Sequence, residues 1–460
     1  MIVGLITVPE LLNKIGAERL GVLSIAWMLV GYLGVLDLGL GRALTRAIGE
    51  QNARGVIVDK QISLSREATR YMVLVGVFWM IVIVSIAPFV TEKLLNIPND
   101  LQIEAKKGFL WLAVAVPFML YATSRVAILE GQQRFRRVNA IKIPLGMATF
   151  IAPLGMSYFD KNIEYILASL LGVRVCAAIS FGLVANWPSC SGKVASCDKN
   201  EMRELFFFGG WLTISNIVSP ILAYFDRFFI GAMLSMTAVT YYTIPQDVLV
   251  RLTALPIAIM GVLFPLLSKS HFLLPEETTK VVRSAAIMFS TVWFSAIGVA
   301  ILVADDFLSW WVGSEVSSHV VNVWYILAVG VFINGFSHLP YNIIQSAGRS
   351  DVTAKIHVIE LIPYLVLMFF CISFLGIEGA AFAWSLRVVF DSSLLFLAAS
   401  KVFHLQRREI SNAFFMMVFC ALTLVALCYV KYDYIRYGIV AFFGFVLLKK
   451  FGLRFMFNEK

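Results

Sequence analysis

Four ionisable residues inside long apolar runs are the sequence's best candidates for chemistry. Arg251 and Asp247 lie four residues apart in the run 237–266, and Arg174 and Arg387 lie in two other runs. A charge at the centre of a membrane-spanning helix costs roughly 2.5–3.5 kcal/mol on insertion scales. Such residues therefore usually face a protein-lined or aqueous interior and mark a functional site. Because guanidinium groups bind phosphate through paired hydrogen bonds, we predict that these four residues bind an anionic substrate.

Each of these residues also has a structural interpretation. Asp247 precedes Arg251 by one helical turn, so the two side chains can pair on one helix face. Arg387 has Asp391 four residues later and can be neutralised in the same way. Arg174 has no acidic residue at that spacing and must find a partner elsewhere. These alternatives stay open at the level of sequence.

Further charges lie near the ends of the apolar runs, where they suit a gate or a helix end. Asp226 and Arg227 precede a short turn, and either cap a helix or help to gate it. Asp37 lies beside Gly39 and Gly41 and suggests a turn or gate residue that pairs with Arg42. Arg125 is placed where a long side chain can extend toward the membrane surface.

The elements that position these residues are membrane-spanning helices. The chain has 460 residues, of which 59% are hydrophobic and only 15% charged, and its mean hydropathy is +0.82. Soluble proteins have nearer a quarter of charged residues. Only helices and closed barrels satisfy their backbone in lipid, and runs of about 20 apolar residues without strict alternation exclude the barrel. The sequence therefore predicts an all-α polytopic membrane protein.

About fourteen membrane-spanning helices are expected, the first of them incomplete. The run 1–12 is too short to span, so we expect the natural start to lie upstream. The others are predicted at 19–40, 71–91, 109–130, 143–159, 164–186, 205–229, 237–266, 284–304, 320–346, 357–376, 378–400, 410–430 and 432–449.

Lysine and arginine are concentrated in alternate loops, which sets the predicted orientation. The basic loops lie around 42–70, 134–142, 193–203, 269–283, 349–355 and 401–408, and a further basic segment closes the chain. Basic loops stay on the cytoplasmic side. We therefore expect a cytoplasmic C-terminus and an outer loop around 305–319. The net charge of +9 then reflects topology and does not indicate nucleic-acid binding.

The chain also repeats itself. Arg70 and Glu92 bound one apolar run, and Arg283 and Asp305 bound another 213 residues later. Arg174 and Arg387 occupy equivalent positions under the same offset. An offset of six helices preserves direction across the membrane, so the repeat is parallel. We expect lobes at 1–200 and 201–408, two additional helices in 409–460, and a site between the lobes.

Motifs of enzymes and metal proteins are not apparent. The sequence contains no phosphate-binding glycine loop and no paired catalytic carboxylates. Of the six cysteines, Cys190 and Cys197 share a loop, but neither a histidine nor a third cysteine lies near them. We therefore predict a non-enzymatic protein without catalytic residues, metal or cofactor. Coupling to an H⁺ or Na⁺ gradient is left open.

Four stretches in order resemble the polysaccharide flippase branch of the multidrug/oligosaccharidyl-lipid/polysaccharide exporter superfamily, and O-antigen translocases most. The first stretch, 15–50, contains the turn Asp37-Leu38-Gly39. The second is "DRFFIGAML" with "VTYYTIP" (226–245), the third is "QSAGRSDVTAKI" (345–356), and the fourth is "LGIEGAAFAWSLR" (375–387). The resemblance extends over nearly the whole chain.

The resemblance implies a function, a substrate and a location. The substrate would be an oligosaccharide on undecaprenyl pyrophosphate, moved by alternating access from the cytoplasmic to the outer leaflet of the bacterial inner membrane. A polysaccharide polymerase and a chain-length regulator are then implied as partners. A cation-coupled multidrug exporter and a lipid II flippase of the same superfamily are alternatives. A membrane glycosyltransferase or polymerase is a more distant one, because the outer loops are short.

Overall fold

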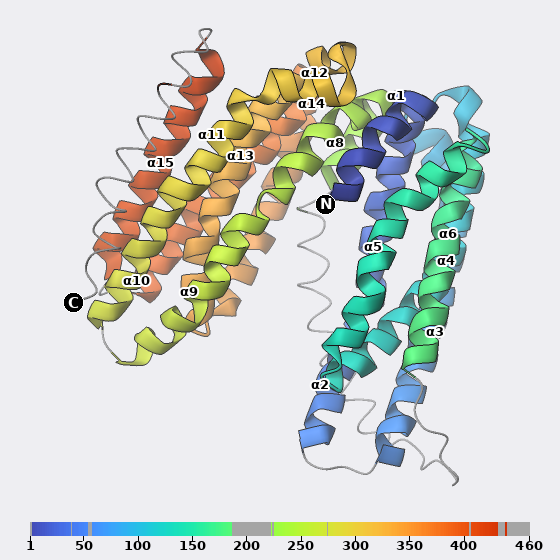
Figure 1. Cartoon of the computed structure of the whole chain (residues 1–460), viewed down its shortest axis with the longest axis horizontal. Helices are drawn as coiled ribbons and strands as arrows, with labels where there is room; N and C mark the ends of the chain where they lie inside the picture. Colours follow the sequence, from blue (N-terminus) through green and yellow to red (C-terminus); the bar gives the residue numbers. More distant parts are fainter. Residues whose placement is uncertain are drawn as a thin grey trace. The chain divides into compact units, whose positions relative to one another are not determined.

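The structure is a computed structural model that describes residues 2–37, 39–53, 58–185, 225–273, 275–403 and 406–430, together with residues 222 and 438. In this part of the chain every regular element is a helix (Figure 1). Nine of the described helices are long and apolar enough to cross a membrane. The predicted class, a multi-pass all-α membrane protein, is confirmed. The count of fourteen stays a prediction, because the predicted helices 205–229 and 432–449 lie largely outside the described residues.

The chain divides into two compact units, residues 1–240 and 241–460. The lobe boundary predicted at residue 200 lies outside the described residues. The segment predicted to follow the second lobe begins with a helix that packs inside the second unit. The three predicted domain ranges therefore stay a prediction.

The first unit is built around α4, which packs against α2, α3 and α6. A second contact layer joins α5 to α6 and to α1, and Figure 1 shows α5 and α6 running side by side. The helices of this unit are α1 (Ile2–Leu33), α2 (Leu40–Ala53), α3 (Val58–Phe89), α4 (Asn99–Gly131), α5 (Phe135–Ser157) and α6 (Ile163–Val184).

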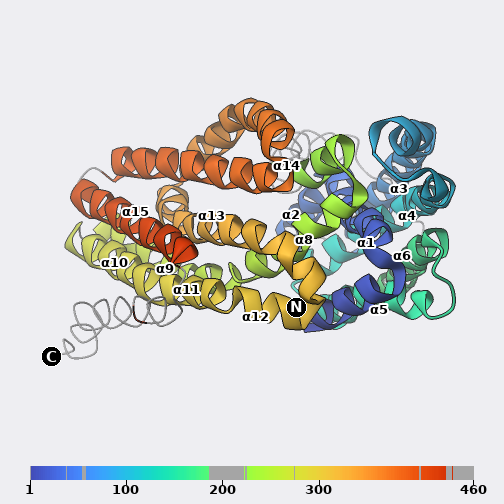
Figure 2. The ribbon, with the colours of Figure 1, turned by 90° about the horizontal axis from the view of Figure 1, so that it is seen from above.

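The second unit is built around α13, which packs against α14, α15 and α9 (Figure 2). Two of its buried tryptophans, Trp293 and Trp324, donate their indole N–H groups to the carbonyl oxygens of Phe332 and Ala300. The boundary between the units falls within α8 (Met236–Arg251). The helices that follow are α9 (Ala254–Leu273), α10 (Pro275–Met288), α11 (Phe294–Leu302), α12 (Ala304–Val312), α13 (Ser314–Ser346), α14 (Ser350–Val402) and α15 (Arg407–Tyr429).

Two glycines interrupt the long helices α1 and α14 where the sequence predicts breaks. Gly16 divides α1 with φ +79° and ψ 168°, and Gly376 divides α14 with φ +61° and ψ −134°. Side chains with a Cβ rarely adopt these values, so glycine is favoured at both positions. The two halves of α14 correspond to the predicted helices 357–376 and 378–400.

Two predicted helices are shorter in the structure. The run 19–40 leaves the α-helix after Leu33 and passes through a 3₁₀ turn, Gly34–Asp37, into the amphipathic α2. The run 237–266 divides into α8 and α9 after Arg251. Pro256 explains the second break, because it has no N–H group to donate to the carbonyl of Leu252, four residues earlier.

Candidate functional site

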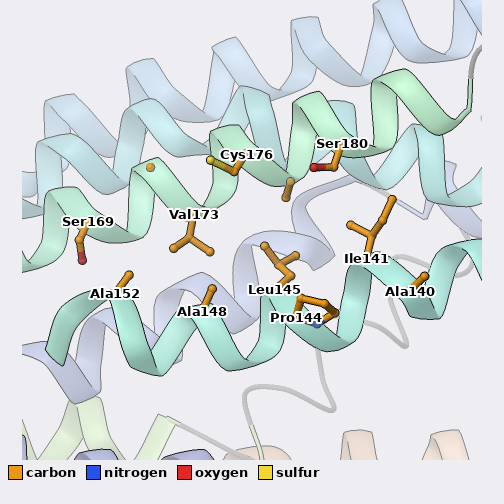
Figure 3. A pocket seen from close by; sticks show the side chains of 12 residues that line it. Ala140, Ile141, Pro144, Leu145, Ala148, Ala152, Ser169, Val173, Cys176 and Ser180 are labelled. Atoms are coloured by element: carbon orange, nitrogen blue, oxygen red, sulfur yellow. The ribbon is translucent and has the colours of Figure 1, made fainter. Parts of the chain in front are cut away.

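A groove of about 500 Å³ lies between α5 and α6 in the first unit (Figure 3). Most of its lining side chains are small, so the two helices leave space between them. The lining residues are Ala140, Ile141, Pro144, Leu145, Ala148, Ala152, Ser169, Gly172, Val173, Cys176, Ala177 and Ser180. Exposed apolar side chains stand beside the groove, among them Ile143 and Ile179. The groove can therefore accept an apolar chain and offers little to a polar one.

Arg174 lies at the side of this groove. It follows the lining residue Val173, and its Nη2 atom is 3.5 Å from the hydroxyl oxygen of Thr149 on α5. The main-chain carbonyl of Thr149 accepts a hydrogen bond of 3.1 Å from the indole of Trp27, which ties α1 to the same place. Three helices thus fix the surroundings of one guanidinium group.

The Arg174 charge is not neutralised by a carboxylate in the described part of the chain. Its Nε atom is buried and has no hydrogen-bond partner, and none of the ion pairs among the described residues includes it. A guanidinium keeps its charge in proteins. This arrangement leaves Arg174 able to bind an anion.

Arg125 is a second cation of the first unit, six residues before the end of α4. Its guanidinium carbon lies 4.9 Å from the centre of the Tyr121 ring, and its Nε atom is buried without a hydrogen-bond partner. A Cβ added at Gly182 of α6 would lie 2.9 Å from the Tyr121 hydroxyl, so this pair packs closely against α6. Arg125 thus packs on an aromatic ring, and its extension toward the membrane surface stays a prediction.

Arg387 has a different environment in the second unit. Its Nη1 atom lies 3.4 Å from Oε1 of Glu360, and its guanidinium carbon is 5.4 Å from the centre of the Tyr364 ring. Asp391, the partner expected from the sequence, lies instead 3.7 Å from Nε2 of His357.

Sequence reasoning missed Glu360, His357 and Tyr364. A signal for them is present, because residues at similar distances before and after the break at Gly376 face one another when the chain reverses. Glu360 precedes Gly376 by 16 residues and Asp391 follows it by 15.

Arg251 is the last residue of α8 and does not lie within a continuous helix. The next two amides, of Leu252 and Thr253, donate to carbonyls only three residues back. Arg251 and Asp247 are both half-buried. The structure therefore places Arg251 at a helix break inside an apolar segment.

The structure gives local contacts for three of the helix-end charges, and their role in a gate stays a prediction. The Asp37 carboxylate accepts hydrogen bonds of 2.9 Å from the amides of both Gly39 and Gly41, and so caps the start of α2. Asp226 and Arg227 are 1% and 5% exposed, so they are not surface groups. The Asp226 carboxylate accepts a hydrogen bond from the Arg227 amide at 2.7 Å.

Comparison with known proteins identifies a family and a relative. Residues 1–271 match the family described as "Polysaccharide biosynthesis protein". The "Putative O-antigen transporter" of Shigella flexneri is 32% identical over 395 residues, which cover 85% of this chain and 93% of that protein.

Two solved structures share the fold. The lipid II flippase MurJ in an inward closed conformation has a TM-score of 0.75 at 13% identity, covering 99% of this chain and 97% of that one. An inward-facing multidrug resistance transporter of the MATE family has a TM-score of 0.72 at 13% identity, covering 89% and 95%.

Proposed function

Because this chain belongs to the polysaccharide biosynthesis protein family, we propose that it is a flippase for a lipid-linked oligosaccharide. Its substrate would be an O-antigen or similar repeat unit on undecaprenyl pyrophosphate. It would move this lipid from the cytoplasmic to the outer leaflet of the bacterial cytoplasmic membrane by alternating access, with its own C-terminus in the cytoplasm.

The observation that carries this proposal is Arg174 beside the α5–α6 groove. A lipid diphosphate has an apolar chain next to a compact negative charge, and its recognition needs an apolar surface next to a cation. The groove supplies the apolar surface, and Arg174 supplies a guanidinium without a carboxylate partner among the described residues. A guanidinium contacts two phosphate oxygens at once.

The rest of the substrate explains why a protein is needed. An oligosaccharide carries many hydroxyl groups, and each costs free energy when it leaves water without a hydrogen-bond partner. The apolar chain has no such cost and can stay in lipid. A flippase therefore has to shield the sugar and neutralise the diphosphate, while the groove guides the chain.

The same cation distinguishes this proposal from a drug exporter. Within the described first unit Arg174 and Arg125 have no carboxylate partner, and cations beside the groove attract an anionic substrate and repel a cationic drug. The likeness to the MATE transporter is a likeness of fold at 13% identity. A lipid II flippase would use the same diphosphate contacts and differs only in its sugar.

Deletion of the protein from its own host tests the proposal. We expect loss of surface polysaccharide, with lipid-linked intermediates retained on the cytoplasmic leaflet, where an impermeant sugar-oxidising reagent cannot reach them in intact cells. Re-expression should restore both readouts. Normal surface polysaccharide together with increased drug sensitivity would indicate an exporter. A block in peptidoglycan synthesis would indicate lipid II, and an altered polymer with normal translocation would indicate a transferase.

A further inference from the structure

Four ionisable side chains meet between the two halves of α14, which are joined at the break at Gly376. His357 and Glu360 come from the first half of the helix, and Arg387 and Asp391 come from the second. One ligand atom each from His357, Glu360 and Asp391 lies within 4.8 Å of the others. The side chains of Glu360, Asp391 and Arg387 are 1%, 9% and 11% exposed. We refer to these four residues as the α14 cluster.

Hydrogen bonding within the α14 cluster is incomplete. Glu360 Oε2, Asp391 Oδ1 and Arg387 Nε are all buried without a hydrogen-bond partner. A buried carboxylate oxygen without a donor is costly. A ligand that supplies one donor between the two carboxylates would remove part of this cost.

The charge balance of the α14 cluster is also incomplete. Two carboxylates face one guanidinium, so one negative charge is uncompensated while the imidazole of His357 is neutral. The helices packed against α14 do not supply a counter-charge within the described residues. The titratable residues considered on these helices are His338 on α13 and, at the start of α15, Arg407, Arg408 and Glu409. None of these four forms an ion pair with the cluster.

We propose that the α14 cluster binds one exchangeable proton, shared among Glu360, Asp391 and His357. A proton converts one carboxylate from an acceptor into a donor, which can then bond to the neighbouring carboxylate. It also brings the cluster to neutrality, as in other buried groups where like charges cannot both ionise. Arg387 disfavours binding of a metal ion by these carboxylates, because its positive guanidinium already lies 3.4 Å from Glu360 and would repel the metal.

Infrared difference spectroscopy on the purified full-length protein tests the proposal without any substrate, so the result does not depend on the proposed transport function. The sample would be titrated between about pH 5 and about pH 9, the range in which imidazoles and buried carboxyl groups titrate. We expect the C=O stretch of one protonated buried carboxyl group at low pH, lost as the pH rises. Glu360→Gln and Asp391→Asn should each remove or shift this band, and Asp306→Asn, at an exposed site in α12, should leave it unchanged.

His357→Gln is the second variant and keeps both carboxylates. Removal of the competing imidazole should leave the proton on the carboxyl pair, so that the midpoint of the band rises by about one pH unit or more. A spectrum without a titrating buried carboxyl band would overturn the proposal. So would a band that stays as in the wild type in both Glu360→Gln and Asp391→Asn. A band that sodium chloride abolishes at constant pH, while choline chloride does not, would also overturn it.

Discussion

The Nη1 atom of Arg387 lies 3.4 Å from a carboxylate oxygen of Glu360, whereas Arg174, at the equivalent position of the sequence repeat, lies 3.5 Å from the hydroxyl group of Thr149 and has no carboxylate partner in the described part of the chain. The two arginines therefore have different surroundings. Arg387 lies against a buried carboxylate, and Arg174 does not. Binding of substrate by either arginine stays a prediction.

Arg174→Gln should reduce transport by about 10–100-fold, because a charge-assisted hydrogen bond contributes about 1.5–3 kcal/mol. Arg174→Lys should recover only part of the activity, since an ammonium group replaces a bidentate guanidinium. Surface polysaccharide in a complemented deletion strain measures the effect. Arg136→Gln, at an exposed position of α5, is the matched loss of one positive charge. Equal effects of the two glutamine variants would contradict a specific role for Arg174.

A bulky residue in the α5–α6 groove should block the apolar chain of the substrate. Ala148→Phe fills space between α5 and α6 and should abolish most of the transport at normal protein levels. Ile151→Phe adds an aromatic ring on an exposed part of the same helix and should have little effect. Transport and membrane abundance would be measured together, and full transport by Ala148→Phe would rule out the groove as a chain-binding site.

Arg387→Gln should destabilise the protein, because it leaves Glu360 and Asp391 buried without a cation. Removal of one partner from a buried ion pair costs about 3–5 kcal/mol. The double variant Arg387→Gln with Glu360→Gln restores charge balance and should recover most of the lost stability. The apparent melting temperature of the detergent-purified protein gives the comparison. If the double variant melts below the single variant, Glu360 is not the partner that Arg387 neutralises.

Arg251 is predicted to bind substrate at the break between α8 and α9. The alternative is that Arg251 serves only to pair with Asp247, and a double variant distinguishes the two. If Arg251 binds the diphosphate, the neutral double variant Arg251→Gln with Asp247→Asn should stay as inactive as Arg251→Gln, and Arg251→Lys should recover part of the transport. Restoration of transport by the double variant would show that the two residues form only a structural pair.

Gly376→Ala should disturb the reversal on which the α14 cluster depends. The φ and ψ angles of Gly376 are +61° and −134°, and strain of this kind costs about 1–3 kcal/mol. Gly146→Ala is the control, because Gly146 lies inside α5 with no atom within 4 Å of an added Cβ. There alanine should be neutral or stabilising by up to about 1 kcal/mol. Equal melting temperatures for the two variants would show that Gly376 is not under conformational constraint.

The sequence alone determines the class of the protein and the position of its charges along the chain. Composition and run length require helices in lipid, since no other open structure satisfies the backbone there. The high cost of charges in apolar runs is enough to identify Arg174, Arg251 and Arg387 as candidate site residues. The breaks at Gly16 and Gly376 fall where the apolar runs of the sequence already predict separate helices.

Tertiary structure decided which charges are neutralised and where an apolar chain can bind. Glu360 meets Arg387 across two antiparallel helices, at a separation in sequence for which helical periodicity makes no prediction. The α5–α6 groove is equally invisible in composition, because alanine, serine and glycine leave free space between two helices without changing their apolar character. Both features arise from packing between helices, and the sequence specifies that packing only through the sum of many weak contacts.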